Sequence, residues 1–170
     1  WRTTRTTPRM SAAETTAEPR TARLAARARA ARRRRTGRAA FAAALLALLA
    51  GAFALRLVGF RSGLPFAYNA DENAHFVPRA IGMFGHSLDP QYFVNPPAFT
   101  YLLHVAFWVR WGSRTAVGDA FAADPSAAFT IARVAAALLG AASVGLLAWA
   151  GARLVDRRTG LVAAALLAVA

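Results

Sequence analysis

The sequence contains no cysteine, and it has only eight acidic residues among 170. The absence of cysteine excludes disulfide bonds, cysteine zinc sites and thiol nucleophiles within this chain. It also means that cysteine usage does not indicate the redox compartment of the protein. Because acidic side chains are scarce and most of the chain is alanine, leucine and arginine, there are few places where acid–base chemistry could occur. The adjacent pair Asp71 and Glu72 is the most prominent of them.

The basic residues are all arginine, and they are unevenly distributed. The chain is 56% hydrophobic, with a mean hydropathy of +0.33 and a formal net charge of +13. Residues 1–40 hold twelve arginines against two glutamates, whereas the remaining 130 residues hold nine arginines against six acids. The sequence therefore predicts a basic tail joined to an apolar body.

Residues 1–38 form this tail. They are rich in threonine, alanine, proline and arginine, with few large apolar side chains, so we expect a disordered segment, with a helix over 20–38 on an anionic surface as the alternative. Arg32–Arg35 could bind nucleic acid, but a basic cluster just before an apolar run is typical of a cytoplasmic flank. We therefore expect a cytoplasmic N-terminus and no nucleic-acid partner.

The apolar body predicts membrane-spanning helices. Residues 39–55 form an unbroken apolar run, which continues to Phe60 if Arg56 reaches the far interface; a signal peptide is the competing interpretation. We predict an all-α polytopic membrane protein, a transmembrane helix bundle over 39–170 that is the N-terminal part of a longer protein. Its predicted spans cover about 39–60, 98–112 and 129–150, with the start of another at 161.

Two features of these spans bear on their arrangement. If the first three all cross, Arg153, Arg157 and Arg158 lie outside, against the positive-inside rule; either segment 98–112 does not fully cross or packing overrides the rule. Segment 129–150 also carries small residues spaced by four or five, which predict close helix packing: Ala136, Gly140, Ala141 and Gly145.

Residues 61–97 form a polar loop, expected on the external side. It should contain a short amphipathic juxtamembrane helix along the membrane surface, with Asp71 and Glu72 at its N-terminus. Asn69 or Asp71 is the natural cap, Gly85 a natural stop, and four apolar residues share one helical face: Val77, Ala80, Ile81 and Phe84.

The residues alone leave the role of the acidic pair open. Negative side chains at a helix N-terminus are favoured by roughly 0.3–1 kcal/mol each, which would account for the pair without any chemistry. Alternatively, one carboxylate accepts a hydroxyl proton as a general base while the other orients the nucleophile. His75 is a candidate ligand, phosphate partner or interface residue.

The segment Asp71-Glu72-Asn73-Ala74-His75-Phe76 resembles the Asp-Glu motif in the first external loop of dolichyl-phosphate-mannose–protein mannosyltransferases, with one extra residue before the histidine. Residues 88–103 resemble that family's aromatic stretch, Pro-Pro pair and second helix. The positions of Arg56, Ala132-Arg133 and residues 151–161 are similar to a wider group that includes bacterial aminoarabinose transferases and actinobacterial relatives. The resemblance covers about residues 45–170.

The resemblance implies a GT-C-type membrane glycosyltransferase in the plasma membrane. Its donor would be a polyprenyl-phosphate sugar, its partners would include membrane lipid, and its acceptor would be a protein, lipid or glycan hydroxyl, with inversion at the anomeric carbon. Asp71 would be the base and Glu72 would help hold the acceptor.

Support for the leaving phosphate would come from other loop residues. The candidates are Arg61, Arg79 and His75, and Asn95 stands where some relatives carry a basic residue. The sequence shows no metal site and no certain cofactor, and it leaves open a divalent cation. The competing interpretation is a non-enzymatic, transporter-like membrane protein whose acidic pair only caps a surface helix.

Overall fold

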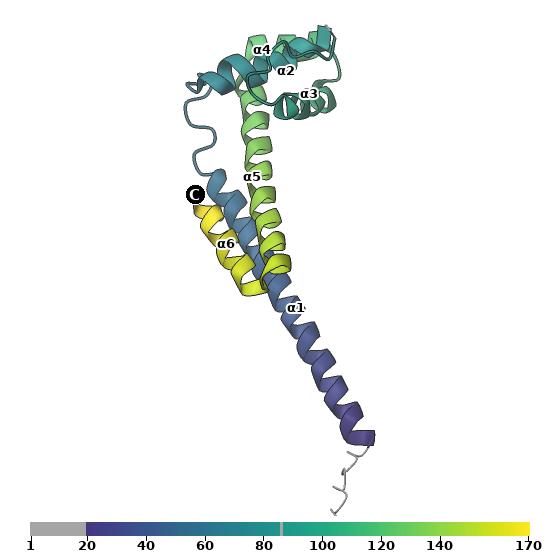
Figure 1. Ribbon diagram of the computed structural model, residues 1–170. Coiled ribbons are helices and arrows are strands. Elements are labelled where there is room, and N and C mark those ends of the chain that lie inside the picture. The colour runs from purple at the N-terminus through teal and green to yellow at the C-terminus, as the bar shows by residue number, and fades with distance from the viewer. Residues whose placement is uncertain (1–19, 86) are drawn as a thin grey trace, which may run out of the picture. The chain divides into compact units, whose positions relative to one another are not determined.

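The computed structural model describes residues 20–85 and 87–170, and this part of the chain is helical with no strand (Figure 1). The elements in chain order are α1 (Arg20–Arg56), a π-helical turn η1 (Asp71–Phe76), α2 (Val77–Gly82), a 3-10 turn η2 (Met83–Gly85), α3 (Ala98–Trp111), α4 (Arg114–Ala123), α5 (Ser126–Leu154) and α6 (Arg157–Val169). The chain divides into two units, residues 1–40 and 41–170, which are described separately.

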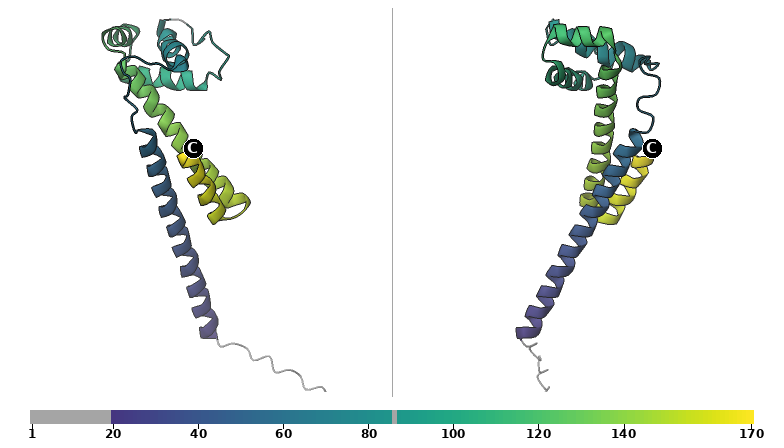
Figure 2. Two further views of the ribbon diagram at one scale, coloured as in Figure 1. Left: turned by 90° about the vertical axis from the view of Figure 1, so that its left-hand side faces the viewer. Right: turned by 180° about the vertical axis from the view of Figure 1, so that it is seen from behind.

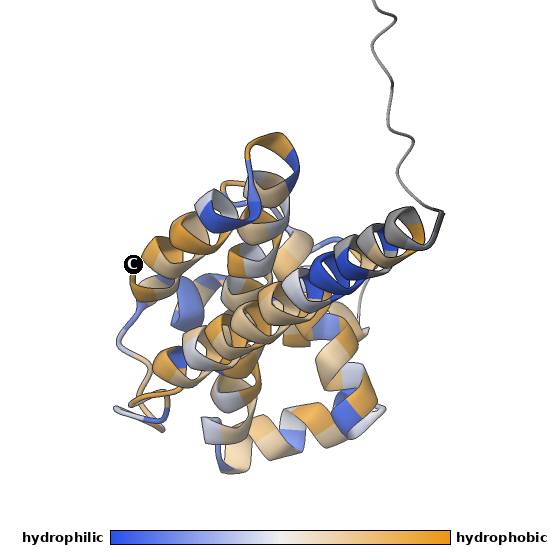
Figure 3. Cartoon of the chain, turned by 90° about the horizontal axis from the view of Figure 1, so that it is seen from below, coloured by the Kyte–Doolittle hydropathy of each residue, from blue (hydrophilic) through white to orange (hydrophobic). Residues whose placement is uncertain are grey.

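In the first unit, the basic segment is helical from Arg20 onward. The prediction of disorder is therefore wrong for residues 20–38, and the helix considered as an alternative is what forms; residues 1–19 lie outside the described part. Arginine and alanine are strong helix formers, which explains why a segment without a core still adopts this conformation. Residues 31–40 are all exposed, and Figure 3 shows α1 changing from hydrophilic to hydrophobic along its length.

Within residues 20–85 and 87–170, two helices are long and apolar enough to cross a membrane, which weakly indicates a membrane protein. They are Ala31–Arg56 of α1 and Ser126–Leu154, the whole of α5. They contain the predicted spans 39–60, apart from its last four residues, and 129–150. Helix α3 has 14 residues and α6 has 13, against the 20 or so that a spanning helix needs.

In the second unit, α1 and α5 run antiparallel. Leu49 lies against Gly145, and Arg56 lies against Gly140, so numbers rise along α1 as they fall along α5. At the other end, the Arg157 guanidinium, just after α5, stands 5.8 Å from the centre of the Phe41 ring. The predicted close packing is confirmed at Gly140 and Gly145, where an added Cβ would lie 2.6 and 3.3 Å from side-chain atoms of α1, and at Ala141, which is buried; it is wrong for Ala136, which is exposed.

Helix α6 turns back along α5 after a tight connection (Figures 1 and 2). A Cβ added to Gly151 of α5 would lie 2.7 Å from the Gly160 Cα of α6, so the two backbones touch. Small buried side chains from α1, α5 and α6 fill the space between the three helices: Ala52, Val144, Ala148, Ala164 and Ala168. This cluster holds the hairpin to the second half of α1.

Helices α2, α3 and α4 lie crosswise to α5 near its N-terminal end, as all three views show (Figures 1 and 2). A second core holds them there, made of large apolar side chains from each helix and from α5: Val77, Leu103, Phe107, Val117 and Phe129. This crosswise layer carries the acidic pair.

The predicted amphipathic helix forms, although its first turns are π-helical. Val77 and Ala80 are fully buried, Ile81 and Phe84 pack against the same core, and η2 ends at Gly85. The apolar face is thus confirmed, but it packs against α3 and not against an open surface. Asn69 supplies the cap, since its Oδ1 accepts a hydrogen bond of 2.9 Å from the Asp71 backbone N–H.

Candidate functional site

The acidic pair is held by an arginine of α5. Arg133 donates through Nε to Glu72 Oε1 at 2.7 Å and through Nη2 to Glu72 Oε2 at 2.9 Å. Both carboxylate oxygens are engaged by one planar guanidinium, which is the strongest geometry for such a pair. The side chains are 22% and 16% exposed, so water screens the pair only partly.

Arg133 also fixes the chain that follows α1. Its Nη1 donates to the carbonyl oxygens of Phe60 at 2.7 Å and Ser62 at 3.0 Å. One side chain therefore joins α5, the turn after α1 and the start of η1. An arginine in an apolar helix raises the free energy of the folded protein unless its N–H groups find acceptors. Here four hydrogen bonds offset that cost.

Asp71 is placed differently from its neighbour. It is exposed, and its own backbone N–H is bound by Asn69. Within the described residues, its carboxylate has no hydrogen-bond or ion-pair partner, and neither acidic side chain caps the helix. Both oxygens of Glu72 are held by Arg133, whereas Asp71 has both oxygens available to a ligand.

A cavity of about 510 Å³ opens beside the pair. Its polar wall consists of Asn69, Asp71, Glu72 and Arg133, and its apolar wall consists of Phe76, Val77, Phe99, Ala132 and Ala136. A second cavity of about 460 Å³ shares Arg133 and Ala136 with it and extends to Phe60 and Arg56. The two hollows adjoin along one face of α5, with Arg133 where they meet and Arg56 in the second hollow only.

His75 and Arg79 lie together, apart from these hollows. The His75 ring stacks on Tyr92 with centroids 4.2 Å apart and 6° between planes, and the Arg79 guanidinium lies 5.9 Å from the same tyrosine ring. The buried His75 Nδ1 has no hydrogen-bond partner among the described residues. The histidine is thus held mainly by ring stacking.

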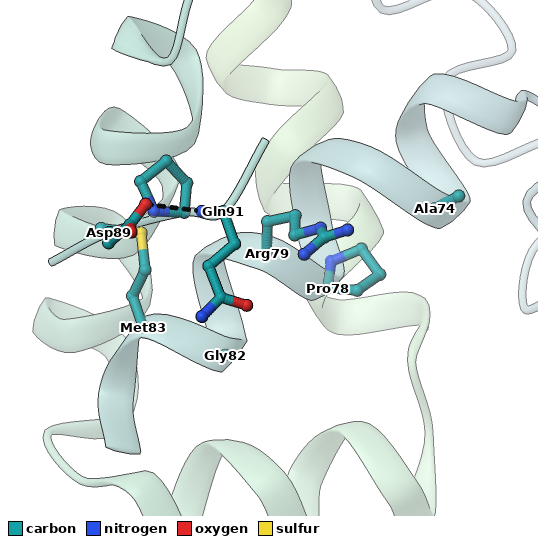
Figure 4. A pocket seen from close by; sticks show the side chains of 8 residues that line it. Ala74, Pro78, Arg79, Gly82, Met83, Asp89 and Gln91 are labelled. Atoms are coloured by element: carbon teal, nitrogen blue, oxygen red, sulfur yellow. Dashed lines mark hydrogen bonds between the residues drawn. The ribbon is translucent and has the colours of Figure 1, made fainter. Parts of the chain in front are cut away.

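Arg79 lines a third cavity, of about 440 Å³, shown in Figure 4. Asp89 and Gln91 stand across it, and the Gln91 backbone N–H donates to Asp89 Oδ1 at 2.8 Å. Gln91 has a φ of 52°, a left-handed conformation that few non-glycine residues adopt. The structure therefore separates the predicted substrate-binding residues His75 and Arg79 from the cavity that Asp71 lines.

Arg61 and Asn95 line none of these cavities. Arg61 is exposed, and its charge helps lower the pKa of Asp124, after the larger effect of hydrogen bonds from Ser126. Asn95 is half-buried in the chain before α3. Among the described residues, no three histidine, aspartate or glutamate side chains gather as a metal site would require.

Arg133 falls within the predicted span 129–150, and no role in the site was predicted for it. The signal that could have found it is its position in an otherwise apolar helix, because such a charge requires a partner. Four acidic residues lie nearer to Arg133 in the chain than Glu72 does, so sequence distance alone would not have identified Glu72 as the partner: Asp89, Asp119, Asp124 and Asp156.

The chain was compared with family models, curated proteins and solved structures. No family model, no curated protein and no solved structure matches it. The site must therefore be interpreted from its own geometry.

Proposed function

We propose that this protein is a multi-pass glycosyltransferase of the plasma membrane, with a cytoplasmic N-terminus. It transfers a sugar from a polyprenyl-phosphate donor to an acceptor hydroxyl on the external side, with inversion. The observation that carries the proposal is the contrast within the acidic pair. Glu72 is bound through both oxygens by Arg133, while the exposed Asp71 carboxylate faces a cavity large enough for a sugar ring.

Asp71 is the general base in this proposal. Its carboxylate takes the proton of the acceptor hydroxyl as the oxygen attacks the anomeric carbon, and the bond from that carbon to the phosphate oxygen breaks. The phosphate leaves with the bonding electron pair, and attack from the opposite face inverts the centre. Glu72 is a positioning residue, since its charge is neutralised by Arg133 and its oxygens are occupied.

The surroundings of the pair suit a donor with a charged head and an apolar tail. Arg133 reaches both the cavity beside Asp71 and the adjoining hollow that ends at Arg56. A leaving phosphate needs cationic support, which Arg56 would supply at the far end of the adjoining hollow, while Arg133 offers the one guanidinium N–H that its four hydrogen bonds leave over. The remaining walls are apolar side chains of the turn after α1, η1, α2, α3 and α5.

The second candidate is a non-enzymatic, transporter-like membrane protein. The observation that favours it is that Glu72 already has a complete structural role, so the pair need not be kept for chemistry. A simple helix-capping role is less suitable, because Asn69 makes the cap and neither acidic side chain does.

The test is Asp71→Asn in the protein expressed from its complete gene. We expect transfer of sugar from a radiolabelled polyprenyl-phosphate donor to fall to background, because an amide cannot take the proton, while membrane insertion and thermal stability stay unchanged. Asn73→Asp serves as a matched control, since Asn73 is exposed two residues away. Wild-type turnover in Asp71→Asn would remove Asp71 from the mechanism and favour the second candidate.

A further inference from the structure

Helix α3 is apolar on two opposite sides. Its inner side is fully buried in the core through Leu103 and Phe107. Its outer side exposes large apolar side chains at helical spacing: Leu102 at 41%, Val105 at 57%, Trp108 at 60% and Val109 at 76%. We call these four residues the outer face of α3. An apolar face of this extent on a soluble protein would mark a site of contact.

The direction of α5 excludes a crossing by α3. Helices α1 and α5 are antiparallel, with Arg56 against Gly140 and Arg157 over Phe41. A single crossing between them would make them parallel, so an even number is required. At 14 residues, α3 is about 21 Å long against an apolar bilayer core of about 30 Å.

The outer face is continuous with a surface that belongs in lipid. A cavity of about 560 Å³ joins Leu102 and Ala106 of α3 to the side of α5 that carries Ile131, Val134 and Leu138. In Figures 1 and 2, α3 lies closer to the middle of α5 than α2 and α4 do. The apolar outer face thus adjoins the apolar side of α5 at Leu102.

We propose that α3 lies in the membrane–water interface, with its outer face inserted among the lipid acyl chains on the side of the membrane opposite Phe41. Trp108 is the side chain that prefers this depth, and Arg110 follows it with a long stem able to reach the headgroups. The inference rests on the membrane location in the proposed function, and it does not require transferase activity.

This arrangement also resolves the distribution of charge. With α3 in the interface, α5 returns to the side from which α1 starts. Arg153, Arg157 and Arg158 then lie on the same side of the membrane as Phe41, before which the sequence carries its arginine cluster, as the positive-inside rule prefers. The spans that cross before residue 154 are then α1 and α5.

The first experiment measures contact with lipid. This chain has no cysteine, so the variants Val105→Cys and Val109→Cys each provide one site within it for an environment-sensitive fluorophore. In vesicles of phosphatidylcholine and phosphatidylglycerol, we expect both labels to lose most of their emission when lipids carrying a doxyl group on the acyl chain are included. Thr115→Cys on exposed α4 is the control and should keep its emission. The proposal would be overturned if the labels at both α3 positions showed the emission of a fluorophore in water and were not quenched by the doxyl lipids.

The second experiment determines, in intact cells, on which side of the membrane each introduced cysteine lies. A membrane-impermeant maleimide should label Ser62→Cys and Thr115→Cys equally, because the two positions flank α3 on one side. Arg158→Cys should react only after permeabilisation. Labelling of Ser62→Cys and Thr115→Cys from opposite sides would show that α3 crosses. Either result is independent of sugar transfer, so failure of this inference and failure of the proposed function are distinguishable.

Discussion

Glu72 and Arg133 are 61 residues apart in the chain, yet they share two hydrogen bonds of 2.7 and 2.9 Å. The pair joins the acidic loop to α5, a helix long and apolar enough to cross a membrane. Arg133 also holds the carbonyls of Phe60 and Ser62, so the loop is tied to α5 at two points. Its geometry is therefore set by α5 and not by the loop alone.

Replacing Arg133 should lower the stability of the protein more than replacing Glu72 does. Glu72→Gln loses the charge, whereas Arg133→Met also leaves the Phe60 and Ser62 carbonyls without their donor. We expect losses of roughly 1–3 kcal/mol in the free energy of unfolding, the larger for Arg133→Met. The free energy of unfolding of Arg133→Lys should be lower than that of wild type and higher than those of the two other variants. An ammonium keeps the charge but cannot bind both carboxylate oxygens in a planar fork.

Thermal unfolding in detergent micelles would measure these differences. The double variant Glu72→Gln with Arg133→Met should lose less than the two single losses combined, because the shared interaction can be lost only once. Strictly additive losses would mean that the two side chains do not interact in the folded protein.

The contact between α5 and α6 should not tolerate even one added methyl group. A Cβ at Gly151 would lie 2.7 Å from Gly160 Cα and 3.2 Å from Gly160 N, which are backbone atoms that cannot rotate away. We expect Gly151→Ala to cost about 1–3 kcal/mol of stability, as overpacked cores do. Gly118→Ala on α4 is the matched control, because nothing lies within 4 Å of its added Cβ. It should be neutral or stabilise by about 0.5–1 kcal/mol. Equal unfolding temperatures for both variants would contradict the close packing.

Asp156 should make the stability of α6 depend on pH. Its Oδ1 accepts a hydrogen bond of 2.8 Å from the Thr159 backbone N–H, which lowers the pKa of this carboxyl below its ordinary value of 3.8. The folded state therefore favours the ionised form. The stabilisation is complete above the unfolded pKa and is lost as the pH falls through the lower folded pKa.

Helicity followed by circular dichroism from pH 6 to pH 2 would test this. Asp156→Asn should retain the cap, since asparagine caps about as well as aspartate, but it should remove this group's share of the acid sensitivity. Asp156→Ala should lower stability at every pH. An unchanged acid transition in Asp156→Asn would show that the carboxylate does not contribute.

The features that could be predicted from the sequence are those that depend on local pattern. The apolar runs indicated the helices able to span, and the spacing of Val77, Ala80 and Ile81 indicated one buried face, because a helix repeats every 3.6 residues. The turn η2 extends to Gly85, the predicted stop. The helical state of residues 20–38 was misjudged because the absence of a core was weighed above the helix preference of arginine and alanine.

The candidate site was predictable only in part, because its contacts join distant segments. Asp71 and Glu72 stood out through scarcity, but the partner of Glu72 depends on how α5 meets the loop. The same holds for His75, whose ring finds Tyr92 only when the chain after η2 folds back. Periodicity carries no information on such pairings.

The 61-residue separation of Glu72 and Arg133 also orders events during biosynthesis. A ribosome releases the acidic loop well before it completes α5, so the loop is made before the residue that anchors it. The site can therefore be assembled only after α5 has been synthesised and placed beside the loop. A chain interrupted before residue 133 would carry the acidic pair but not the geometry that separates the free carboxylate from the fixed one.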